Sequence, residues 1–427
     1  MEMLAGVGRE IITPELGTNL FGYAGNIIGI EIRDALTVTA AAFEYNGIKS
    51  MIISATLCLI NTELSDEIRG KISGVTGVPE QNIMLSATHT HSGPSVQNYE
   101  GWGIINRDYC DKIFIPGCIK AAKDAVYSMK SVKMGAGSAE SRVGINRREF
   151  TREGYIGLGQ NPWGTYDPNM TVLSFKGTGD GIPVLNIIHY GAHCTAMGCN
   201  NLISRDWSGI MTDRLEAESG AVTMFINGTQ GDTGPRLSNG QTCGNPELTA
   251  EIGALAAIDA VRIYKNIRTY RSAECSVISG KINIPFEPLM PLDEARRRIA
   301  EYETIPEHNL GRRIYTTLSK IIDMHERGDA GEKEFVMEQT SIRLGDAVFV
   351  PMPFETFSEI SLRLRKFAPF EHVLVAACTN GDNSYLPTQD QLCRGGYEVE
   401  MFYWNRPRRL PDNTDTLIIN NILNYLN

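Results

Sequence analysis

The amino-acid sequence predicts an α/β fold in which twisted β-sheets are flanked by helices. Two stretches, far apart in the chain, share one order of elements: a β-hairpin, a helix, and a strand that ends in polar residues. The contents of 42% hydrophobic and 21% charged residues are typical of globular proteins. A chain of 427 residues can build one large core, and we expect residues 1–427 to form a single domain.

The first of these stretches begins with Thr37 to Phe43 and Ser50 to Leu59, which are rich in β-branched and apolar residues. They flank Asn46-Gly47, a strong hairpin signal. The second strand is almost continuously hydrophobic, as is typical of a strand buried on both faces. An amphipathic helix is predicted at about Glu63 to Val75, followed by a strand from Ile83 to Thr88.

The second stretch repeats this order near the C-terminus. Gln339 to Leu344 and Ala347 to Pro351 flank the turn Gly345-Asp346, a helix is predicted at about Glu355 to Lys366, and a strand at Val373 to Cys378. The spacing indicates an internal structural repeat of two hairpin-helix-strand halves. We expect their final strands to bring site residues to a shared cleft.

Between the two stretches lie a helix at about Asp111 to Met129 and strands near 132–137, 170–175 and 183–189. A further helix, Pro246 to Tyr264, is well signalled, with Asn245 as its N-cap and Pro246 at its first position. Residues 289–332 differ, because they contain a charged helical segment that ends at Gly328-Asp-Ala-Gly331. We interpret 289–332 as a helical excursion on the surface, either a lid or a contact of a homo-oligomer.

The net charge of -10, without a long basic cluster, argues against nucleic acid or an anionic membrane as the main partner. The expected partner is a small-molecule substrate. No apolar run is long enough for an integral membrane segment, and no secretory signal is visible at the N-terminus. The nine cysteines are scattered without a CxxC motif, which is typical of reduced thiols in a cytoplasmic protein. A secreted enzyme that has lost its signal is the alternative.

Four of the seven histidines lie beside two predicted strand ends. His89 and His91 are two residues apart, so in an extended strand their side chains point to the same side. His189 and His193 mark the second transition from strand to loop. Two histidine clusters at separate strand ends favour a metal site over structural histidines, and imidazole with carboxylate favours Zn2+.

A third candidate site is the loop that follows Phe225. It reads Asn227-Gly-Thr-Gln-Gly-Asp-Thr-Gly-Pro235, with the carboxylate of Asp232 among glycines. Glycine allows the backbone to approach a ligand closely. The same pattern also fits a plain turn with an Asx cap, and the residues alone leave both interpretations open.

Taken together, these residues resemble the N-terminal catalytic domain of the neutral/alkaline non-lysosomal ceramidase family. The resemblance spans most of the chain, and its strength lies in the order of the motifs rather than in any one of them. The segments that carry it are Gly6–Arg9, Phe21–Ala24, Thr88–Pro94, Ile145–Arg147, Tyr166–Val172, His193–Met197, Leu202–Asp206, Gly231–Asp232, Pro353–Glu355, Asn380–Tyr385 and Gly396–Glu398.

The resemblance implies a ceramidase-like catalytic domain and assigns a role to each candidate residue. The implied zinc ligands are His89, His193, Glu355 and Tyr385. The implied catalytic residues are His91 for proton transfer or for holding an oxyanion, Asp232 for orienting water or substrate or for supporting a ligand, and Arg147 for substrate contact. The further residues expected to bind substrate are Asn146, Asp206, Gly231 and Thr233.

The chain departs from the family in the third loop. Where ceramidases carry a serine that is important for amide cleavage, this chain has Gly234, and the neighbouring Thr233 is expected to face elsewhere. Direct attack by a metal-activated water is therefore favoured over a serine-assisted mechanism. The sequence also ends where the family's C-terminal immunoglobulin-like domain would begin, which further separates it from a true ceramidase.

We therefore expect a zinc-dependent hydrolase that cleaves an amide, ester or related bond in a small molecule that need not be a sphingolipid. One alternative is a zinc enzyme acting on a carbohydrate or glycoside, with polar side chains such as Asp206, Arg147 and Asp232 on its hydroxyls. Another is a non-catalytic metal-binding or ligand-binding protein. An open metal position distinguishes a hydrolase from a closed structural site.

Overall fold

The computed structural model describes residues 2–99, 102–304 and 310–427, and its core consists of three copies of one unit. In each unit the first strand pairs antiparallel with the second, the second pairs antiparallel with the third, and a helix then leads to a fourth strand parallel to the third. A closing helix follows each fourth strand. This confirms the α/β prediction.

The elements of unit 1 are β1 (Leu4–Ile11), β4 (Thr37–Tyr45), β5 (Ile48–Ala55), α1 (Thr62–Thr76), β6 (Ile83–Ala87) and α3 (Ile115–Tyr127). Those of unit 2 are β8 (Lys130–Glu140), β11 (Asn169–Gly177), β12 (Pro183–Tyr190), α4 (Asp206–Ser219), β14 (Val222–Asn227) and α5 (Pro246–Asn266). Those of unit 3 are β16 (Cys275–Pro285), β17 (Glu334–Leu344), β18 (Ala347–Pro351), α8 (Ser358–Phe367), β20 (His372–Ala376) and α11 (Thr414–Leu426).

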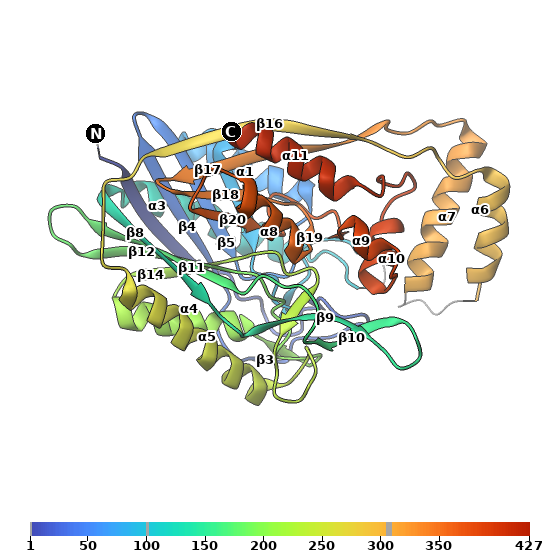
Figure 1. Ribbon diagram of the computed structural model, residues 1–427, viewed down its shortest axis with the longest axis horizontal. Coiled ribbons are helices and arrows are strands. Elements are labelled where there is room, and N and C mark those ends of the chain that lie inside the picture. The colour runs from blue at the N-terminus through green and yellow to red at the C-terminus, as the bar shows by residue number, and fades with distance from the viewer. Residues whose placement is uncertain (1, 100–101, 305–309) are drawn as a thin grey trace.

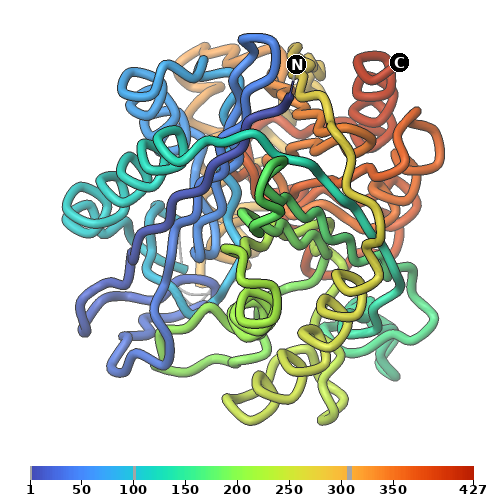
Figure 2. Tube along the Cα trace, turned by 90° about the vertical axis from the view of Figure 1, so that its left-hand side faces the viewer, coloured from blue at the N-terminus to red at the C-terminus, as the bar shows by residue number. Residues whose placement is uncertain are grey.

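The three units pack their sheets around one shared core. That core takes Phe43 from unit 1, Leu173 from unit 2 and Phe349 from unit 3, together with their neighbours on the same strand faces. The opposite face of each sheet is covered by the helices of its own unit. Figure 2 shows these helices on three sides of the molecule, blue to cyan, green to yellow, and orange to red.

Glycines in the first strands bring the closing helices close to the sheets. A Cβ on Gly8 of β1 would lie 2.2 Å from the carbonyl oxygen of Ala121 in α3. A Cβ on Gly280 of β16 would lie 2.4 Å from the ring of Tyr425 in α11. Any larger residue would push these helices away from their strands.

The predicted repeat of two halves is confirmed for units 1 and 3, but the sequence-based count was too low. Units 1 and 2 together form the eight-stranded sheet, joined where β1 meets β8, and unit 3 forms the four-stranded sheet. Unit 2 escaped detection because its helix α4 begins at Asp206 in a left-handed conformation (φ 58°) and contains Gly209. Neither feature gives the helical start signal on which the prediction depended.

Two predicted boundaries were wrong. The helix expected from Glu355 begins instead at Ser358, because Glu355 and Thr356 form the short strand β19 beside β21 (Tyr385–Leu386). The helix expected from Asp111 is interrupted by a π-helical segment, Cys110–Phe114, between α2 (Arg107–Tyr109) and α3. Pro116, which lacks an N–H, lies just after this segment and favours the change in hydrogen-bond pattern.

Each unit also carries an insertion between its first and second strands. The insertions contain β2 (Leu20–Phe21) and β3 (Glu31–Ile32) in unit 1, β9 (Gly144–Phe150) and β10 (Ile156–Asn161) in unit 2, and α6 (Leu292–Ile299) and α7 (Leu310–Arg327) in unit 3. The helices α6 and α7 lie within the predicted helical excursion 289–332, of which residues 305–309 are outside the described part. In Figure 1 the hairpins β9–β10 and α6–α7 lie toward the same end of the molecule.

The remaining elements are short. Three are strands: β7 (Gly93–Pro94) pairs with β2, β13 (Leu202–Ile203) pairs with β3, and β15 (Thr233–Pro235) pairs with β9. Two are helices, α9 (Gln389–Leu392) and α10 (Tyr397–Tyr403). There are also 3-10 turns at Glu80–Asn82 and Ala300–Tyr302.

The first, third and fourth strands of a unit run in one direction, so their C-terminal ends share one edge. The ends of the three fourth strands are bonded to one another. Asn227 donates from Nδ2 to the carbonyl of Thr88 (2.9 Å), the N–H of Ala377 donates to the carbonyl of Asn227 (3.1 Å), and the N–H of Ala87 donates to the carbonyl of Cys378 (3.1 Å). The loops of all three units therefore converge at one place.

Candidate metal centre

His89 lies two residues beyond the end of β6, in a left-handed conformation (φ 67°) that turns its ring inward. Its Nδ1 is 3.0 Å from the carbonyl oxygen of Cys58, which can only accept a hydrogen bond. Nδ1 therefore carries the proton, and the lone pair of Nε2 faces the centre of the molecule. The side chain is 1% exposed.

His193 lies three residues beyond the end of β12 and is held in the same way. Its Nδ1 is 2.7 Å from the carbonyl oxygen of Gln230 and 3.1 Å from that of Thr233. Its own N–H donates to the carbonyl of Thr233, and its carbonyl accepts from the indole N–H of Trp207 (3.0 Å). Burial lowers the pKa of His193 to about 3, with the positive charge of Arg147 adding to the effect, so the ring is neutral.

Glu355 completes a cluster with these two rings. Its Oε2 lies 3.2 Å from Nε2 of His89 and 3.1 Å from Nε2 of His193. The backbone is fixed by the pairing of β19 with β21 and by Gly231, where a Cβ would come within 2.4 Å of the carbonyl oxygen of Glu355.

The three facing atoms fit a metal ion. Because both Nδ1 atoms use their protons on carbonyl groups, the Nε2 atoms and the carboxylate oxygen meet as three acceptors with no hydrogen between them. Accordingly, His193 Nε2 and Glu355 Oε2 are buried without a hydrogen-bond partner. A cation at this point would satisfy them, and carbonyl groups behind the ligating histidines are the usual way to fix their tautomer.

Tyr385 lies directly opposite Glu355 in the short parallel pair β19–β21. Its hydroxyl accepts a hydrogen bond from Nη2 of Arg147 (2.9 Å), and the guanidinium carbon lies 5.6 Å from the ring centroid. Burial raises the pKa of Tyr385 well above its usual value, and Arg147 partly offsets this. The structure thus brings Tyr385 beside the cluster of His89, His193 and Glu355.

His91 borders the cluster on the more open side. Its Nε2 is 3.3 Å from Nε2 of His89, and its Nδ1 has no hydrogen-bond partner. The ring lies between Gly22, where a Cβ would come within 2.4 Å of it, and Tyr23, whose ring is edge-on at 5.0 Å. Burial and then the neighbouring His89 and His193 lower the pKa of His91, so this ring is also neutral.

Arg147, from β9, connects the cluster to Glu398, a residue to which the sequence assigned no role. Its Nε donates to Oε1 of Glu398 (2.9 Å), while Arg148 donates from Nη1 to Oε2 of the same carboxylate (2.6 Å). Glu398 is fully buried, and its carboxylate accepts hydrogen bonds from two buried arginines. The only sequence signal for it was its place in the Gly396–Glu398 segment.

Asp232 and its neighbours Gly231 and Thr233 form the support beneath the cluster. The carboxylate of Asp232 accepts from the N–H and the Oγ of Ser358 (both 2.9 Å) at the first turn of α8. Burial raises the pKa of Asp232 to about 6. The N–H of Gly231 donates to the carbonyl of Thr356, and the carbonyl of Thr233 holds His193. These contacts position the ligands, whereas the role in substrate binding expected for Gly231 and Thr233 remains a prediction.

Asp206 and Asn146 are also occupied by internal bonds. Asp206 is 1% exposed, and its two carboxylate oxygens accept from the N–H groups of Ala196, Met197 and Trp207. Asn146 donates to the carbonyl of Thr165 and accepts from the N–H of Arg148. For both Asp206 and Asn146, these hydrogen bonds favour a role in positioning the backbone over direct contact with a substrate. His189 is structural, since its Nε2 lies 2.9 Å from the carbonyl of Val375.

Gly234 packs against Thr242. A Cβ at position 234 would lie 2.6 Å from Cβ and 2.7 Å from Cγ2 of Thr242. The space that a serine side chain would need is therefore filled from the neighbouring loop. Sequence reasoning could not detect this contact, because the two residues are joined only by the fold.

Two buried cysteines, Cys58 and Cys378, were also missed. Their sulfur atoms lie 3.7 Å and 3.8 Å from Nδ1 of His89. The repeat offers the signal that could have found them. Cys58 follows the third strand of unit 1 as His193 follows that of unit 2, and Cys378 follows the fourth strand of unit 3 as His89 follows that of unit 1.

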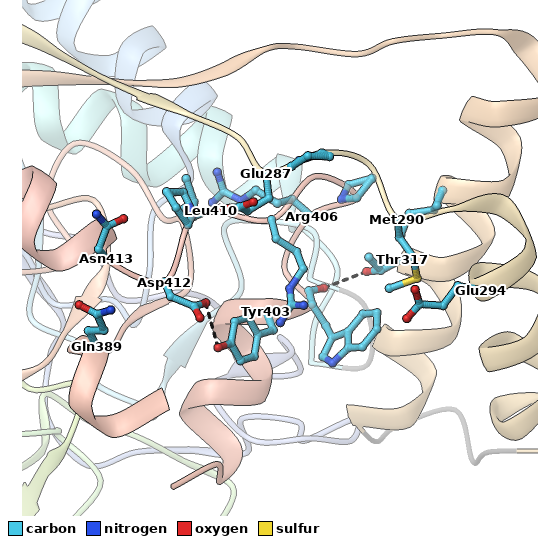
Figure 3. A pocket seen from close by; sticks show the side chains of 16 residues that line it. Glu287, Met290, Glu294, Thr317, Gln389, Tyr403, Arg406, Leu410, Asp412 and Asn413 are labelled. Carbon is cyan, nitrogen blue, oxygen red and sulfur yellow. Dashed lines mark hydrogen bonds between the residues drawn. The ribbon is translucent and has the colours of Figure 1, made fainter. Parts of the chain in front are cut away.

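Three cavities lie near this centre. Asn146 and Asp232 border one of about 570 Å³ beside the β9–β10 hairpin. One of about 630 Å³ lies between α7 and the loops of the metal centre. One of about 680 Å³, drawn in Figure 3, lies beyond Trp404. Among the described residues, His89, His193, Glu355 and Tyr385 line none of these three cavities. Among the helices of the described ranges, none is long and apolar enough to cross a bilayer.

Comparisons with known proteins identify the family of the chain. Residues 3–256 match the family model described as neutral/alkaline non-lysosomal ceramidase, N-terminal. Neutral ceramidase B of Dictyostelium discoideum is 30% identical over 249 residues, which is 53% of this chain and 34% of that protein. Neutral ceramidase of Pseudomonas aeruginosa is 26% identical over 257 residues, 55% of this chain and 37% of that protein. The matched part is thus about a third of the length of these relatives.

The fold is also similar to solved structures. The crystal structure of neutral ceramidase from Pseudomonas aeruginosa superposes with a TM-score of 0.74 at 19% identity, covering 99% of this chain and 73% of that one. A ceramidase complexed with C2 gives a TM-score of 0.74 at 18% identity, covering 100% of this chain and 75% of that one. The likeness therefore extends beyond residue 256 into unit 3, which supplies Glu355 and Tyr385.

Proposed function

Because this chain belongs to the neutral/alkaline non-lysosomal ceramidase family, we propose that it is a zinc-dependent hydrolase that cleaves an amide, ester or related bond in a small molecule. The observation that carries the proposal is the meeting of three unprotonated atoms, Nε2 of His89, Nε2 of His193 and Oε2 of Glu355. Each belongs to a side chain that the backbone holds in place, which is the preorganisation that a catalytic site requires.

The residues that would hold the metal are His89, His193 and Glu355, with Tyr385 as the fourth. Two imidazoles and a carboxylate are a ligand set that zinc accepts, and Tyr385, as a labile fourth ligand, would give its position to water or substrate. When bound, zinc supplies Lewis-acid polarisation of a carbonyl and lowers the pKa of a coordinated water to about 7. The hydrogen bond from Arg147 to the Tyr385 hydroxyl stabilises its phenolate form.

His91 is the residue placed to move the proton. Its pKa is lowered, so it is neutral at pH 7 and can take a proton from the attacking water. It then donates that proton to the leaving nitrogen or oxygen, which keeps the leaving group neutral as the bond to the carbonyl carbon breaks. Gly22 and Tyr23 hold the ring in the orientation that this transfer needs.

Water is the nucleophile in this proposal, because position 234 carries no hydroxyl. Thr242 fills the space beside Gly234, and the hydroxyl of Thr233 is buried and directed to Asp232 (3.2 Å). These contacts support a substrate other than ceramide.

The test is the hydrolysis of p-nitrophenyl acetate and p-nitroacetanilide by the zinc-loaded protein. We expect turnover that a chelator abolishes and that zinc restores, with Lys123→Met as a control variant of an exposed lysine in α3. Turnover that survives complete metal removal would contradict the proposal. Zinc binding without hydrolysis of any acyl derivative would favour a non-catalytic metal-binding protein.

A further inference from the structure

The third insertion lies at the same place in its unit as two insertions that reach the metal centre. In unit 1 the insertion places Tyr23 against His91, and in unit 2 it places Arg147 on Tyr385. In unit 3 the insertion is the α6–α7 hairpin, whose Leu310 packs against the cluster of Phe357, Tyr385 and Met401. Its α7 forms one wall of the cavity of about 630 Å³, which we call the α7 cleft.

The other walls of the α7 cleft are the segments that carry the metal centre. Asn61 follows Cys58 by three residues, Gln97 and Asn98 follow His91, and Asp382 precedes Tyr385 by three residues. All of these line the cleft. Tyr99, which also lines the cleft, packs against the cluster of Phe357, Tyr385 and Met401, so the cleft lies beside the residues of the metal centre.

One face of α7 supplies the opposite wall. Arg313, Thr317 and Lys320 lie on it at the spacing of successive helical turns. The guanidinium of Arg313 lies 4.4 Å from the ring centroid of Tyr99, and it donates to Oδ1 of Asn405. Thr317 donates to the carbonyl of Trp404 (2.8 Å), which separates the α7 cleft from the cavity of Figure 3.

The lining is polar and has free hydrogen-bonding capacity. Gln97 is 2% exposed, and its Oε1 has no partner. Lys320 on one wall and Glu63 on the other are exposed and make no hydrogen bond or ion pair with any residue of the described ranges. In the cavity of Figure 3, by contrast, polar lining groups already interact with one another. Tyr403 donates a hydrogen bond to Asp412 (3.1 Å), and Arg409 lies over the ring of Tyr403.

We propose that the α7 cleft binds a hydroxyl-rich group, such as a sugar ring, that is attached to the bond cleaved at the metal centre. Among the described residues that line the cleft, Ile104 is the only one with an aliphatic side chain, so an acyl chain there would remove water from charged groups without compensation. Amide, carboxylate and ammonium groups around a half-buried aromatic ring instead match sugar hydroxyls and the apolar face of a sugar ring. A volume of about 630 Å³ suits a ligand of one or two rings.

This inference rests on the proposed hydrolase, and its first test compares two substrates with the same acetamide bond. N-acetylglucosamine carries a sugar, and N-hexylacetamide carries an alkyl chain. We expect the zinc-loaded protein to hydrolyse the sugar derivative with a kcat/KM at least about tenfold higher, the effect of one additional hydrogen bond to a charged group. A preference for N-hexylacetamide would overturn the inference.

The second test uses Lys320→Met, which removes one ammonium from an exposed position of α7. We expect the ratio of the two kcat/KM values to fall about tenfold, mainly through KM for the sugar derivative, and to be recovered in part by Lys320→Arg. Lys123→Met is the matched control and should leave the ratio unchanged. A ratio that Lys320→Met also leaves unchanged would contradict a sugar subsite in the cleft.

A binding measurement separates this inference from the proposed function. Glucosamine has no bond to cleave, and calorimetry with the zinc-loaded protein should show an affinity that Lys320→Met lowers about tenfold. If neither acetamide is hydrolysed but this pattern is found, the cleft inference stands and the hydrolase proposal fails. If N-hexylacetamide is hydrolysed and glucosamine does not bind, the hydrolase stands and the cleft inference fails.

Discussion

The metal centre and the α7 cleft adjoin each other but are built in opposite ways. In the metal centre, Nδ1 of His89 and Nδ1 of His193, which do not face the cluster, are hydrogen-bonded to backbone carbonyls. In the α7 cleft, Gln97, Lys320 and Glu63 keep groups without partners. The centre comes from the loops of the three repeated units, and the cleft is closed by an insertion in only one of them. In our proposal the framework therefore carries the chemistry and the insertion selects the substrate.

The largest effect is expected from Glu355→Gln, which tests whether the centre is a metal site. An amide in place of the carboxylate removes the negative charge between the two imidazoles. Because even residues that only support a ligand typically contribute 10-fold to 100-fold in metal affinity, we expect a loss of more than about 100-fold, measured by competition with a chelator. Unchanged zinc affinity would show that the cluster is not the metal site.

His91→Ala should separate chemistry from metal binding within the centre. We expect zinc to be retained and kcat to fall by about 10²-fold to 10⁴-fold, because proton transfer is lost. Metal content and turnover are measured on the same sample. Loss of zinc in this variant, with turnover per bound zinc unchanged, would instead make His91 a ligand.

The stability of the framework should depend on pH through Asp206. Burial raises the pKa of this carboxyl from 3.8 to about 6 in the folded protein. The folded state therefore binds more protons than the unfolded state between these values, and Asp206 makes unfolding easier as the pH rises from about 4 to about 6. The contribution lost is up to about 3 kcal/mol, from 1.36 kcal/mol for each pKa unit.

Asp206→Asn isolates this effect, because the amide does not titrate. The difference between the unfolding free energies of wild type and variant, from denaturant melts of the metal-free proteins, should shrink as the pH rises through this window. A difference that is constant from pH 4 to pH 7 would mean that the carboxyl keeps an ordinary pKa.

A smaller effect is expected at the contact of Gly234 with Thr242. Gly234→Ser should destabilise the protein by about 1 to 3 kcal/mol, as overpacking usually does. Adding Thr242→Gly removes the atoms in the way, so the double variant should be more stable than the sum of the two single changes predicts. Additive effects would show that the side chain at position 234 avoids Thr242.

The sequence was most informative where one residue type carried a geometric rule. Asn-Gly located the hairpin of unit 1. The sequence also brought His89 and His91 to one site, but the expected extended strand was wrong, because both lie beyond the end of β6 and His89 is left-handed. Glu355 and Tyr385 could be proposed only from the family resemblance, because their proximity depends on the pairing of β19 with β21. The structure confirms that these residues lie together, while their roles as ligands remain predictions.

The sequence was least informative about contacts between distant loops. Residues that share no periodic pattern are joined by these contacts. They are the hydrogen bonds of Asp232 and Asp206, the bonds from two arginines to Glu398, and the contact of Gly234 with Thr242. Unit 2 was missed for a related reason, because its helix begins in a conformation that no capping signal marks. Such features follow from packing rather than from local propensity.

The most direct test of the account is the metal content of the purified wild-type protein after expression in zinc-replete medium. We predict about one zinc per chain by elemental analysis, because the two histidines and Glu355 form a single cluster of facing acceptors. A protein that is folded and contains no zinc under these conditions would contradict the central claim.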